Sequence, residues 1–308
     1  MLFRSRRPAV TRRESVGLGT IEHLETRALL AGDSILTATA VSLSEGLAGT
    51  GYFLANETDT IVSAGEADYW SFQAQAGDVV SVAVDAAQSG LNPSIQLQNA
   101  AGGMLAADID SGPDGGGFIS HYSIGSSGTY FVRISSGDSS TGGYTLHVDL
   151  ARGVQLEYDR DYANNQISTA NELTWTVSGL QKQATVAGTI MARQGGTTDV
   201  DTYALGVLNA GNTVTLGIRV PTGSTLAPLV QVVNSAGVAV ADTDPTDAGF
   251  SGSITASDSY YAIVSNAYFV RNGWRYQLTP SWSTWADAEA YAQSLGGHLA
   301  TIPDARSE

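Results

Sequence analysis

The chain has 308 residues, a formal net charge of −15 and no cysteine. This length suits about two domains of ordinary size. Without cysteine, the chain has neither disulfides nor thiolate metal sites. A surface this acidic repels phosphate backbones, so nucleic acid is not an expected partner. We expect no membrane span either, because no apolar run approaches the roughly 20 residues that a bilayer requires.

Residues 1–32 have a basic start, with five arginines within the first 13 residues. The continuous apolar stretch of a standard secretory signal does not follow them. We therefore expect a disordered leader. Within it, the sequence LETRALL at residues 24–30 resembles the LEPRxLL segment of large exported planctomycete proteins, with Thr26 in place of the proline. The resemblance implies a location at the cell surface or outside the cell.

Two long segments of the chain resemble each other. The sequence ADYWSFQAQAGDVV around Asp68 aligns with VDTYALGVLNAGNTV around Asp201, and LNPSIQLQNAAG aligns with LAPLVQVVNSAG. Further along, the tyrosines of the two copies align in the same order, Tyr130 and Tyr144 with Tyr261 and Tyr276. The order and spacing hold over both copies, which indicates a duplication with a period of about 130 residues.

Each copy carries the alternation that is typical of half-buried strands. Val214, Leu216 and Ile218 alternate with polar or small residues, and turn-forming sequences such as NAAGG, GSSG and NSAG separate such runs. Many short strands joined by tight turns favour antiparallel sandwiches. We predict an all-β chain with two tandem antiparallel β-sandwich domains of jelly-roll type. The first spans residues 33–150, a linker spans residues 151–162, and the second spans residues 163–280.

Both copies also resemble a known domain family. The sequences DYWSF, AGD, GTYFV and GYTL of the first copy, with DTYAL, AGN and YYAIV of the second, resemble the bacterial pre-peptidase C-terminal domain. That resemblance implies a small sandwich that is non-catalytic and attached to secreted proteases or other exported proteins. Some members of the family bind calcium.

Each copy has an aspartate-rich loop that is followed by glycine and then phenylalanine, DIDSGPD in the first and DTDPTD in the second. Calcium takes six to eight oxygen ligands, and alternating aspartates on a bent loop can supply several of them. We predict calcium as a cofactor, with ligands from both loops: Asp108, Asp110, Asp114, Asp242, Asp244 and Asp247. The alternative stays open, because aspartates also cap turns without any metal.

Other acidic residues are weaker candidates for a site. Asp159 and Asp161 flank Arg160, whose positive charge disfavours a metal there. Asp68 and Asp201 occupy matching places where a strand begins, and we expect them to accept backbone N–H groups in the preceding turn.

No catalytic residue is predicted, and we interpret the chain as a non-enzyme. The four histidines stand apart, and none belongs to an HExxH zinc motif. The GxSxG sequence of a nucleophile elbow does not occur either.

The last residues differ from the rest, because TWADAEAYAQSLGGHLATIPDARSE reads as a helix followed by a strand. Thr284 is a plausible N-cap, with Asp287 three residues later. The segment resembles the opening of a C-type lectin-like domain, in a pattern matched by Trp285, Ala288, Ala292, Gly296, Gly297, His298 and Leu299. The resemblance implies that residues 281–308 begin an incomplete α+β domain. The alternative is a helix that packs on the second sandwich.

Three functions follow as hypotheses. The first is a non-catalytic, exported surface protein that binds carbohydrate or extracellular matrix through the lectin-like domain, with the sandwiches as spacers. No carbohydrate-binding residue is named, because the family's sugar ligands lie later in the domain. The second is an accessory region of a secreted peptidase or other enzyme, by analogy with other such sandwiches. The third is a purely structural stalk.

Overall fold

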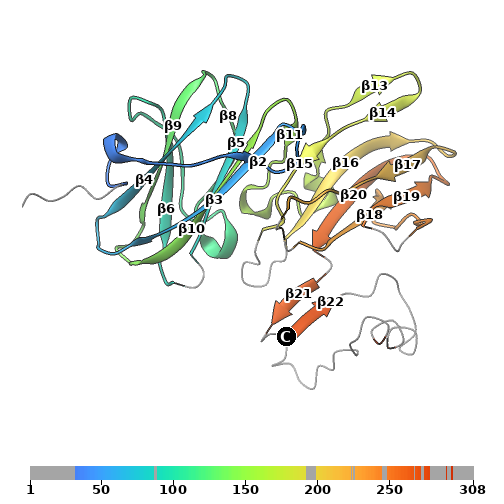
Figure 1. Ribbon diagram of the computed structural model, residues 1–308. Helices are drawn as coiled ribbons and strands as arrows, with labels where there is room; N and C mark the ends of the chain where they lie inside the picture. Colours follow the sequence, from blue (N-terminus) through green and yellow to red (C-terminus); the bar gives the residue numbers. More distant parts are fainter. Residues whose placement is uncertain are drawn as a thin grey trace, which may run out of the picture.

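The computed structural model describes residues 32–86, 89–191, 199–222, 224, 226–244, 248–266, 268–271, 274–277, 289 and 293. Apart from the helical residues Glu289 and Gln293, the described residues form β-strands, four short 3-10 turns and the loops between them, which confirms the predicted all-β class (Figure 1). The turns are η1 Ile35–Thr37, η2 Pro113–Gly115, η3 Arg160–Tyr162 and η4 Ile167–Thr169. We call residues 32–151 the first unit, residues 152–165 the connecting segment and residues 166–266 the second unit.

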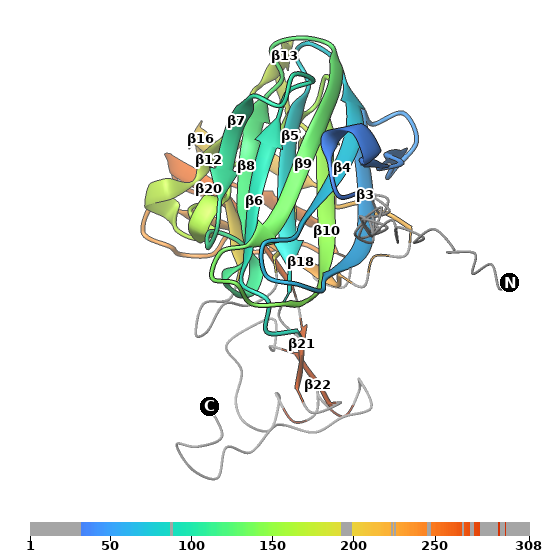
Figure 2. The ribbon, with the colours of Figure 1, turned by 90° about the vertical axis from the view of Figure 1, so that its left-hand side faces the viewer.

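The first unit consists of two five-stranded sheets packed face to face (Figure 2). One sheet has the order β1-β4-β9-β6-β7, formed by Thr39–Ala40, Ala67–Ala74, Gly128–Ser136, Pro93–Gln98 and Met104–Asp108. The other has the order β2-β3-β10-β5-β8, formed by Ser44–Glu45, Tyr52–Ile61, Gly142–Ala151, Val79–Asp85 and Phe118–Ser123. The described pairs are antiparallel except β1 with β4, which is parallel.

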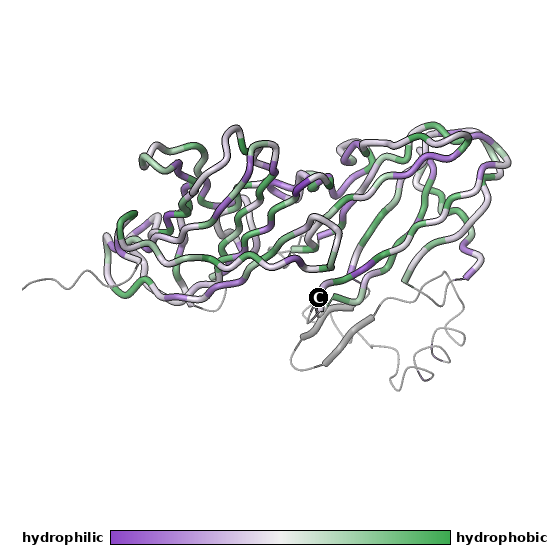
Figure 3. The backbone as a smooth tube through the Cα atoms, turned by 45° about the horizontal axis from the view of Figure 1, so that its top comes forward, coloured by the Kyte–Doolittle hydropathy of each residue, from purple (hydrophilic) through white to green (hydrophobic). Residues whose placement is uncertain are grey.

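Alternation along the strands explains why these residues form a sandwich. On β10, Tyr144, Leu146 and Val148 are buried while Thr145 and His147 between them are not. The same alternation of hydrophobic and hydrophilic residues runs along the strands of both units (Figure 3). Because successive side chains of a strand point to opposite faces, one face of each sheet becomes apolar. The two apolar faces meet in one continuous core.

The second unit has a smaller set of sheets. Its four-stranded sheet has the order β12-β16-β20-β18, formed by Asn171–Glu172, Val200–Leu208, Asp258–Asn266 and Pro228–Asn234. Facing it is the pair β17-β19, formed by Thr213–Leu216 and Phe250–Ser253, and both layers contribute to a separate core. Three further pairs are β11-β15 (Gln155–Leu156, Val186–Ala187), β13-β14 (Thr176–Ser178, Gln181–Gln183) and β21-β22 (Tyr268–Arg271, Trp274–Gln277).

The two units repeat the same hydrogen bonds. In each, a short strand after a 3-10 turn pairs in parallel with the strand that carries the aligned aspartate, β1 with β4 and β12 with β16. Asn99 accepts hydrogen bonds from the N–H groups of the residues two and four positions later, and Asn234 does the same. The turn at Asp78 matches that at Asn212, whose side chain accepts from the N–H three residues earlier.

One pair of residues in the sequence alignment needs correction. Tyr130 is buried, and its hydroxyl donates to the backbone oxygen of Ser126, four residues earlier, at 2.7 Å. In the second unit the residue with this geometry is Tyr260, which donates to Ala256 at 2.7 Å. Tyr261 therefore is not the counterpart, because a shift of one residue turns a side chain to the other face of the strand. Tyr276 lies on β22, which pairs with β21.

Some sequence predictions lie outside the described residues. These are the leader at residues 1–31 and most of the lectin-like segment, of which the structure describes Glu289 and Gln293. Gln293 donates a side-chain hydrogen bond of 2.7 Å to Glu289, four residues earlier. Among the described residues, no helix is long and apolar enough to cross a membrane.

A buried hydrogen-bonded chain joins the two sheets of the first unit and yields a prediction. Trp70 Nε1 donates to the Tyr144 hydroxyl at 2.9 Å, which donates to Asp68 at 2.6 Å. Tyr144→Phe leaves both neighbours without their partner, so the free energy of unfolding should fall by about 1–3 kcal/mol. Chemical denaturation measures it. The control Tyr69→Phe removes the hydroxyl of a half-buried tyrosine on the other face of β4 and should cost less; equal losses would contradict the prediction.

Candidate metal centre at the junction of the two units

The predicted calcium loop of the first unit is closed by Asp108. Its buried carboxylate accepts hydrogen bonds from the N–H groups of Ser111 and Phe118, from the Ser111 hydroxyl and from Arg160. Both oxygens are thus engaged by donors within the protein. Asp110 and Asp114 are exposed. The hydrogen bonds at Asp108 are those of a carboxylate that organises a turn.

The loop of the second unit repeats part of this arrangement. Asp242 accepts hydrogen bonds of 3.1 Å from the N–H groups of Asp244 and Ser251. Asp244 is exposed, and Asp247 lies outside the described residues. Calcium binding by these loops stays a prediction, while the turn-capping hydrogen bonds of the alternative are present at both Asp108 and Asp242.

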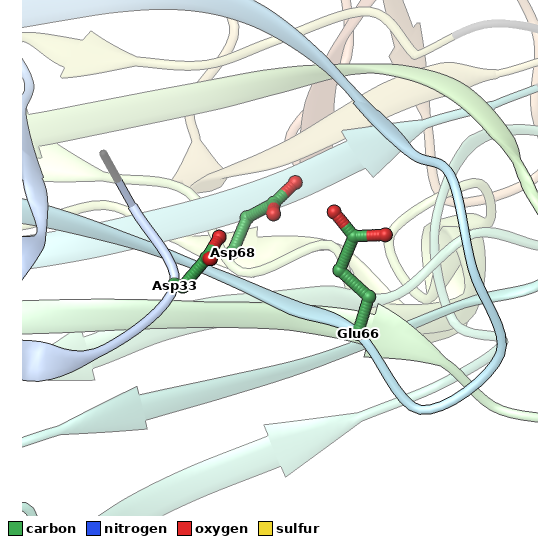
Figure 4. Close-up of side chains that lie close together, drawn as sticks. All are labelled: Asp33, Glu66 and Asp68. Carbon is green, nitrogen blue, oxygen red and sulfur yellow. The ribbon is translucent and has the colours of Figure 1, made fainter. Parts of the chain in front are cut away.

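Carboxylates gather instead at the places where the aligned strands β4 and β16 begin. In the first unit, Asp33, Glu66 and Asp68 have ligand oxygens within 4.8 Å of one another (Figure 4). Donors of the same unit already engage two of them. Glu66 Oε2 accepts the N–H groups of Val62 and Ser63 at 2.8 Å each, and Asp68 Oδ2 accepts the Tyr144 hydroxyl.

In the second unit, Asp159, Asp199 and Asp201 form a corresponding group within 4.8 Å, and all three are buried. Asp199 immediately precedes β16 and Asp201 is the second residue of that strand, while Asp159 comes from the connecting segment. Two more buried residues of that segment complete what we call the junction cluster. Glu157 accepts a 2.7 Å hydrogen bond from the Tyr203 hydroxyl, and Asn164 Nδ2 donates to Asp201 at 3.3 Å.

Unpartnered oxygens set this cluster apart from the group at Asp68. Four buried side-chain atoms among the described residues have no hydrogen-bond partner: Asp159 Oδ2, Asn164 Oδ1, Asp199 Oδ1 and Thr202 Oγ1. The first three belong to the junction cluster, and Thr202 lies next to Asp201. Asn164 is fully buried. A buried polar atom without a partner costs about 1–3 kcal/mol. Below about pH 8 the Asp159 carboxyl carries a proton that it shares with Asp199, whereas Asn164 Oδ1 has no such partner and is the oxygen that points to a ligand.

The cluster also lacks a countercharge. The ion pairs found among the described residues join Arg152 to Asp78 and Arg160 to Asp108 and Asp161, so none includes a cluster carboxylate. Burial, reinforced by neighbouring carboxylates, raises the pKa of Asp159 to about 8. Burial also raises the pKa of Glu157 to about 7 and that of Asp199 to about 6. For Asp201, burial and the Glu157 charge raise the pKa well above its usual range.

The donor set fits a hard cation. All the cluster's candidate donors are carboxylate or amide oxygens, which suit calcium or magnesium, whereas softer transition metals favour imidazole and thiolate ligands. The backbone at Gly188 also approaches closely, since a Cβ there would clash with Glu157 Oε2 and the Tyr203 hydroxyl. The second unit therefore packs directly against the carboxylate of the connecting segment.

Sequence reasoning reached this cluster only in part. It named Asp159 but weighed Arg160 against a metal, and it gave Asp68 and Asp201 a turn-capping role. In the structure, Asp68 accepts a tyrosine hydroxyl, and the Arg160 side chain bonds to Asp108 of the first unit. The signal that could have found the cluster is the sequence DVD before the aligned strand.

Comparisons with known proteins agree with the fold of the first unit. The family model of the bacterial pre-peptidase C-terminal domain matches residues 66–136, the stretch from the start of β4 to the end of β9. One such domain is therefore present, and it fits a non-catalytic β-sandwich. No curated protein matches the chain.

Among solved structures, the periplasmic inhibitor PliG of g-type lysozyme from Aeromonas hydrophila is 15% identical, with a TM-score of 0.28, over 37% of this chain and 96% of its own. The tandem CBM22-1-CBM22-2 domain of Paenibacillus barcinonensis Xyn10C is 12% identical, with a TM-score of 0.21, over 74% of this chain and 91% of its own. Both TM-scores are below 0.5, so neither likeness supports a functional conclusion.

The acidic group of the first unit gives a prediction about pH. Burial raises the pKa of Asp68 to about 6, although the hydrogen bond from Tyr144 opposes the rise. Because the folded state then binds the proton more tightly than the unfolded state, this contribution to stability is complete below about pH 4 and is lost as the pH rises through about 6.

The measurement is the free energy of unfolding of the parent chain minus that of Asp68→Asn, taken in chelator. This difference should fall by up to about 3 kcal/mol between pH 4 and pH 7. The asparagine variant cannot titrate at this position, so a difference that stays flat across the range would contradict the assignment.

Proposed function

We propose that this chain is a non-catalytic, exported multidomain protein whose two β-sandwich units serve as spacers joined at a calcium-binding junction. The second unit, in this proposal, is a divergent copy of the pre-peptidase C-terminal domain. The junction cluster supports the proposal, because it combines buried carboxylates with unpartnered oxygens on one oxygen-only site. Asp159, Asn164, Asp199 and Asp201 would hold the ion, with Glu157 beside them.

Calcium is preferred to magnesium by the form of the site. Calcium accepts irregular shells of six to eight oxygens, whereas magnesium demands near-ideal octahedral geometry and keeps several waters. The cluster draws its oxygens from two separate segments and is buried, which leaves little room for a hydrated ion. The ion would supply charge neutralisation at a structural site, and no reaction is assigned to it.

The test is whether one substitution shifts the melting temperature in opposite directions in chelator and in calcium. At pH 9, above the pKa of about 8 of Asp159, Asp159→Asn removes a negative charge from the cluster, so in chelator it should raise the melting temperature by a few degrees, about 2–4 °C per kcal/mol for a chain of this size. In millimolar calcium it should lower the melting temperature relative to the parent, because a ligand charge is lost. Calorimetric titration should show calcium binding by the parent and at least about tenfold weaker binding by the variant.

Asp161→Asn is the matched control, since Asp161 is an exposed neighbour that contacts Arg160. It should leave both the affinity and the melting temperatures unchanged. A triple variant of Asp108, Asp110 and Asp114 to asparagine tests the loop that the sequence predicted. If calcium binding is lost in the triple variant and retained in Asp159→Asn, the ion belongs to the loop and the junction assignment is wrong.

The proposal also includes carbohydrate binding, which the sequence of the C-terminal residues supports. The sequence at residues 284–299 resembles the first helix of a C-type lectin-like domain. We expect a protein that continues this domain to bind glycans in a calcium-dependent manner, which a glycan array on the full-length product measures. An array without calcium-dependent binding would leave the accessory region of an exported enzyme or the structural stalk.

A further inference from the structure

We infer that the outer face of the sheet β1-β4-β9-β6-β7 in the first unit binds an acidic glycan, a saccharide that carries uronic-acid carboxylates. The residues of this face belong neither to the junction cluster nor to the lectin-like segment, so the inference adds a separate binding site that needs no calcium. It follows from one row of side chains, Tyr69, Arg133 and Gln96, which crosses three neighbouring strands.

The composition of this face differs from that of the chain. Alternate residues of β4, β9 and β6 belong to the core, so the residues between them form the outer face, which is turned toward the viewer in Figure 2. The outer face carries hydroxyl, amide, aromatic and small side chains, together with one arginine, and its positions on these three strands include no carboxylate. In a chain with 30 acidic residues, Arg133 thus stands on a face without a negative charge.

The register of the sheet places the three side chains of the row next to one another. Arg133 on β9 lies directly opposite Tyr69 on β4 and directly opposite Gln96 on β6. Opposite residues of antiparallel strands have Cβ atoms about 4.5–5.5 Å apart, so the row extends about 10 Å across the sheet. All three side chains are half-buried. An aromatic ring, a guanidinium and an amide are therefore held at fixed spacing on a rigid sheet.

Arg133 and Gln96 present N–H donors without a charged partner. Arg133 Nη1 donates to Ser135 Oγ at 2.9 Å, and the ion pairs found among the described residues involve Arg152 and Arg160 but not Arg133. Gln96 Oε1 accepts a 3.1 Å hydrogen bond from the Gln98 amide, which leaves the Gln96 amide nitrogen for a ligand. A planar guanidinium can bind both oxygens of a carboxylate, which is the acceptor that this row fits best.

The second unit shows that the fold does not require this row. In the equivalent register, Thr202 on β16 lies opposite Ile263 on β20, which lies opposite Gln231 on β18. A threonine and an isoleucine thus stand where the first unit has Tyr69 and Arg133. Because the same sheet forms with these residues, we attribute the tyrosine and the arginine of the first unit to a ligand.

The form of the face favours a saccharide over an acidic peptide. Bound peptides add a strand to an open sheet edge or place apolar side chains in a groove. The row lies across the middle of the sheet, and Phe131, the large apolar residue of the same face, is only 8% exposed. An aromatic ring beside N–H donors suits a sugar, whose ring has apolar C–H faces and a rim of oxygens.

Calorimetric titration of the full chain with a galacturonate oligosaccharide tests the inference. Chelator excludes calcium-dependent binding, and at about 0.15 M salt the charges more than about 8 Å from the row are largely screened. The parent should bind the oligosaccharide. Its methyl ester should bind at least about tenfold more weakly, because esterification removes the negative charge that pairs with Arg133.

Substitutions in the row locate the site. Arg133→Gln should weaken binding at least about tenfold, and Arg133→Lys should weaken it less, because lysine keeps the charge but not the planar fork. The matched control Arg219→Gln removes the same charge from an exposed arginine of the second unit and should leave the affinity unchanged. Tyr69→Thr, which copies the second unit, should also weaken binding, while Tyr69→Phe keeps the ring and should bind nearly as well as the parent.

Four results would overturn the inference. The first is no binding by the parent, and the second is equal affinity for the acid and its methyl ester. The third is an equal loss in Arg133→Gln and Arg219→Gln, which would indicate a general attraction between charges. The fourth is equally tight binding of an oligoglutamate of the same length, which would make the face a site for acidic peptides. These outcomes leave the proposed calcium site standing, because the titrations contain chelator.

Discussion

Carboxylates of one sign, buried close together, are the constraint on which the junction depends. Glu157 and Asp159 approach Asp199 and Asp201 where water cannot screen them, and the ion pairs of the described residues lie elsewhere. A charge taken from water into a protein interior is tolerated when it is paired, coordinated or neutralised by a proton. Coordination is the solution that also gives Asn164 Oδ1 a partner.

The matching hydrogen bonds of the two units show why such a cluster forms at one position and not at the other. Asp68 and Asp201 stand at the same place in the repeat. In the first unit the long strand β10 supplies Tyr144, whose hydroxyl satisfies Asp68. In the second unit Asp201 accepts only longer hydrogen bonds, 3.3 Å from Asn164 and 3.4 Å from the Tyr203 hydroxyl, and its other neighbours are carboxylates. A change of neighbours thus converts a hydrogen-bonded aspartate into a candidate metal ligand.

The sequence was sufficient for the features that depend on local pattern. Alternation along the strands predicted the all-β class, and the order of motifs indicated the repeat before the two units displayed the same hydrogen bonds. The alignment of the two copies was wrong by one residue at Tyr261. Two adjacent tyrosines fit the same motif, and only the burial of Tyr260 decides between them. The junction cluster depends on a contact between residues about 40 positions apart, which periodicity does not encode.

The role of Arg160 shows the same limit. Beside Asp159 and Asp161 in the sequence, its charge argued against a metal. Arg160 begins the 3-10 turn η3, and its guanidinium is bonded to Asp108 and Ser111 of the first unit. The residue that disfavoured the site is thus the one that ties the segment to its neighbour.

The position of the cluster between the units, and not inside either of them, has a consequence if the chain is exported as proposed. Free calcium is scarce inside cells and abundant in most media outside them. With the proposed site, the two units would fold around their own cores before an ion binds at the joint between them. The ion would bind only upon release, so the surroundings, and not the ribosome or the secretion machinery, would decide when the junction is complete.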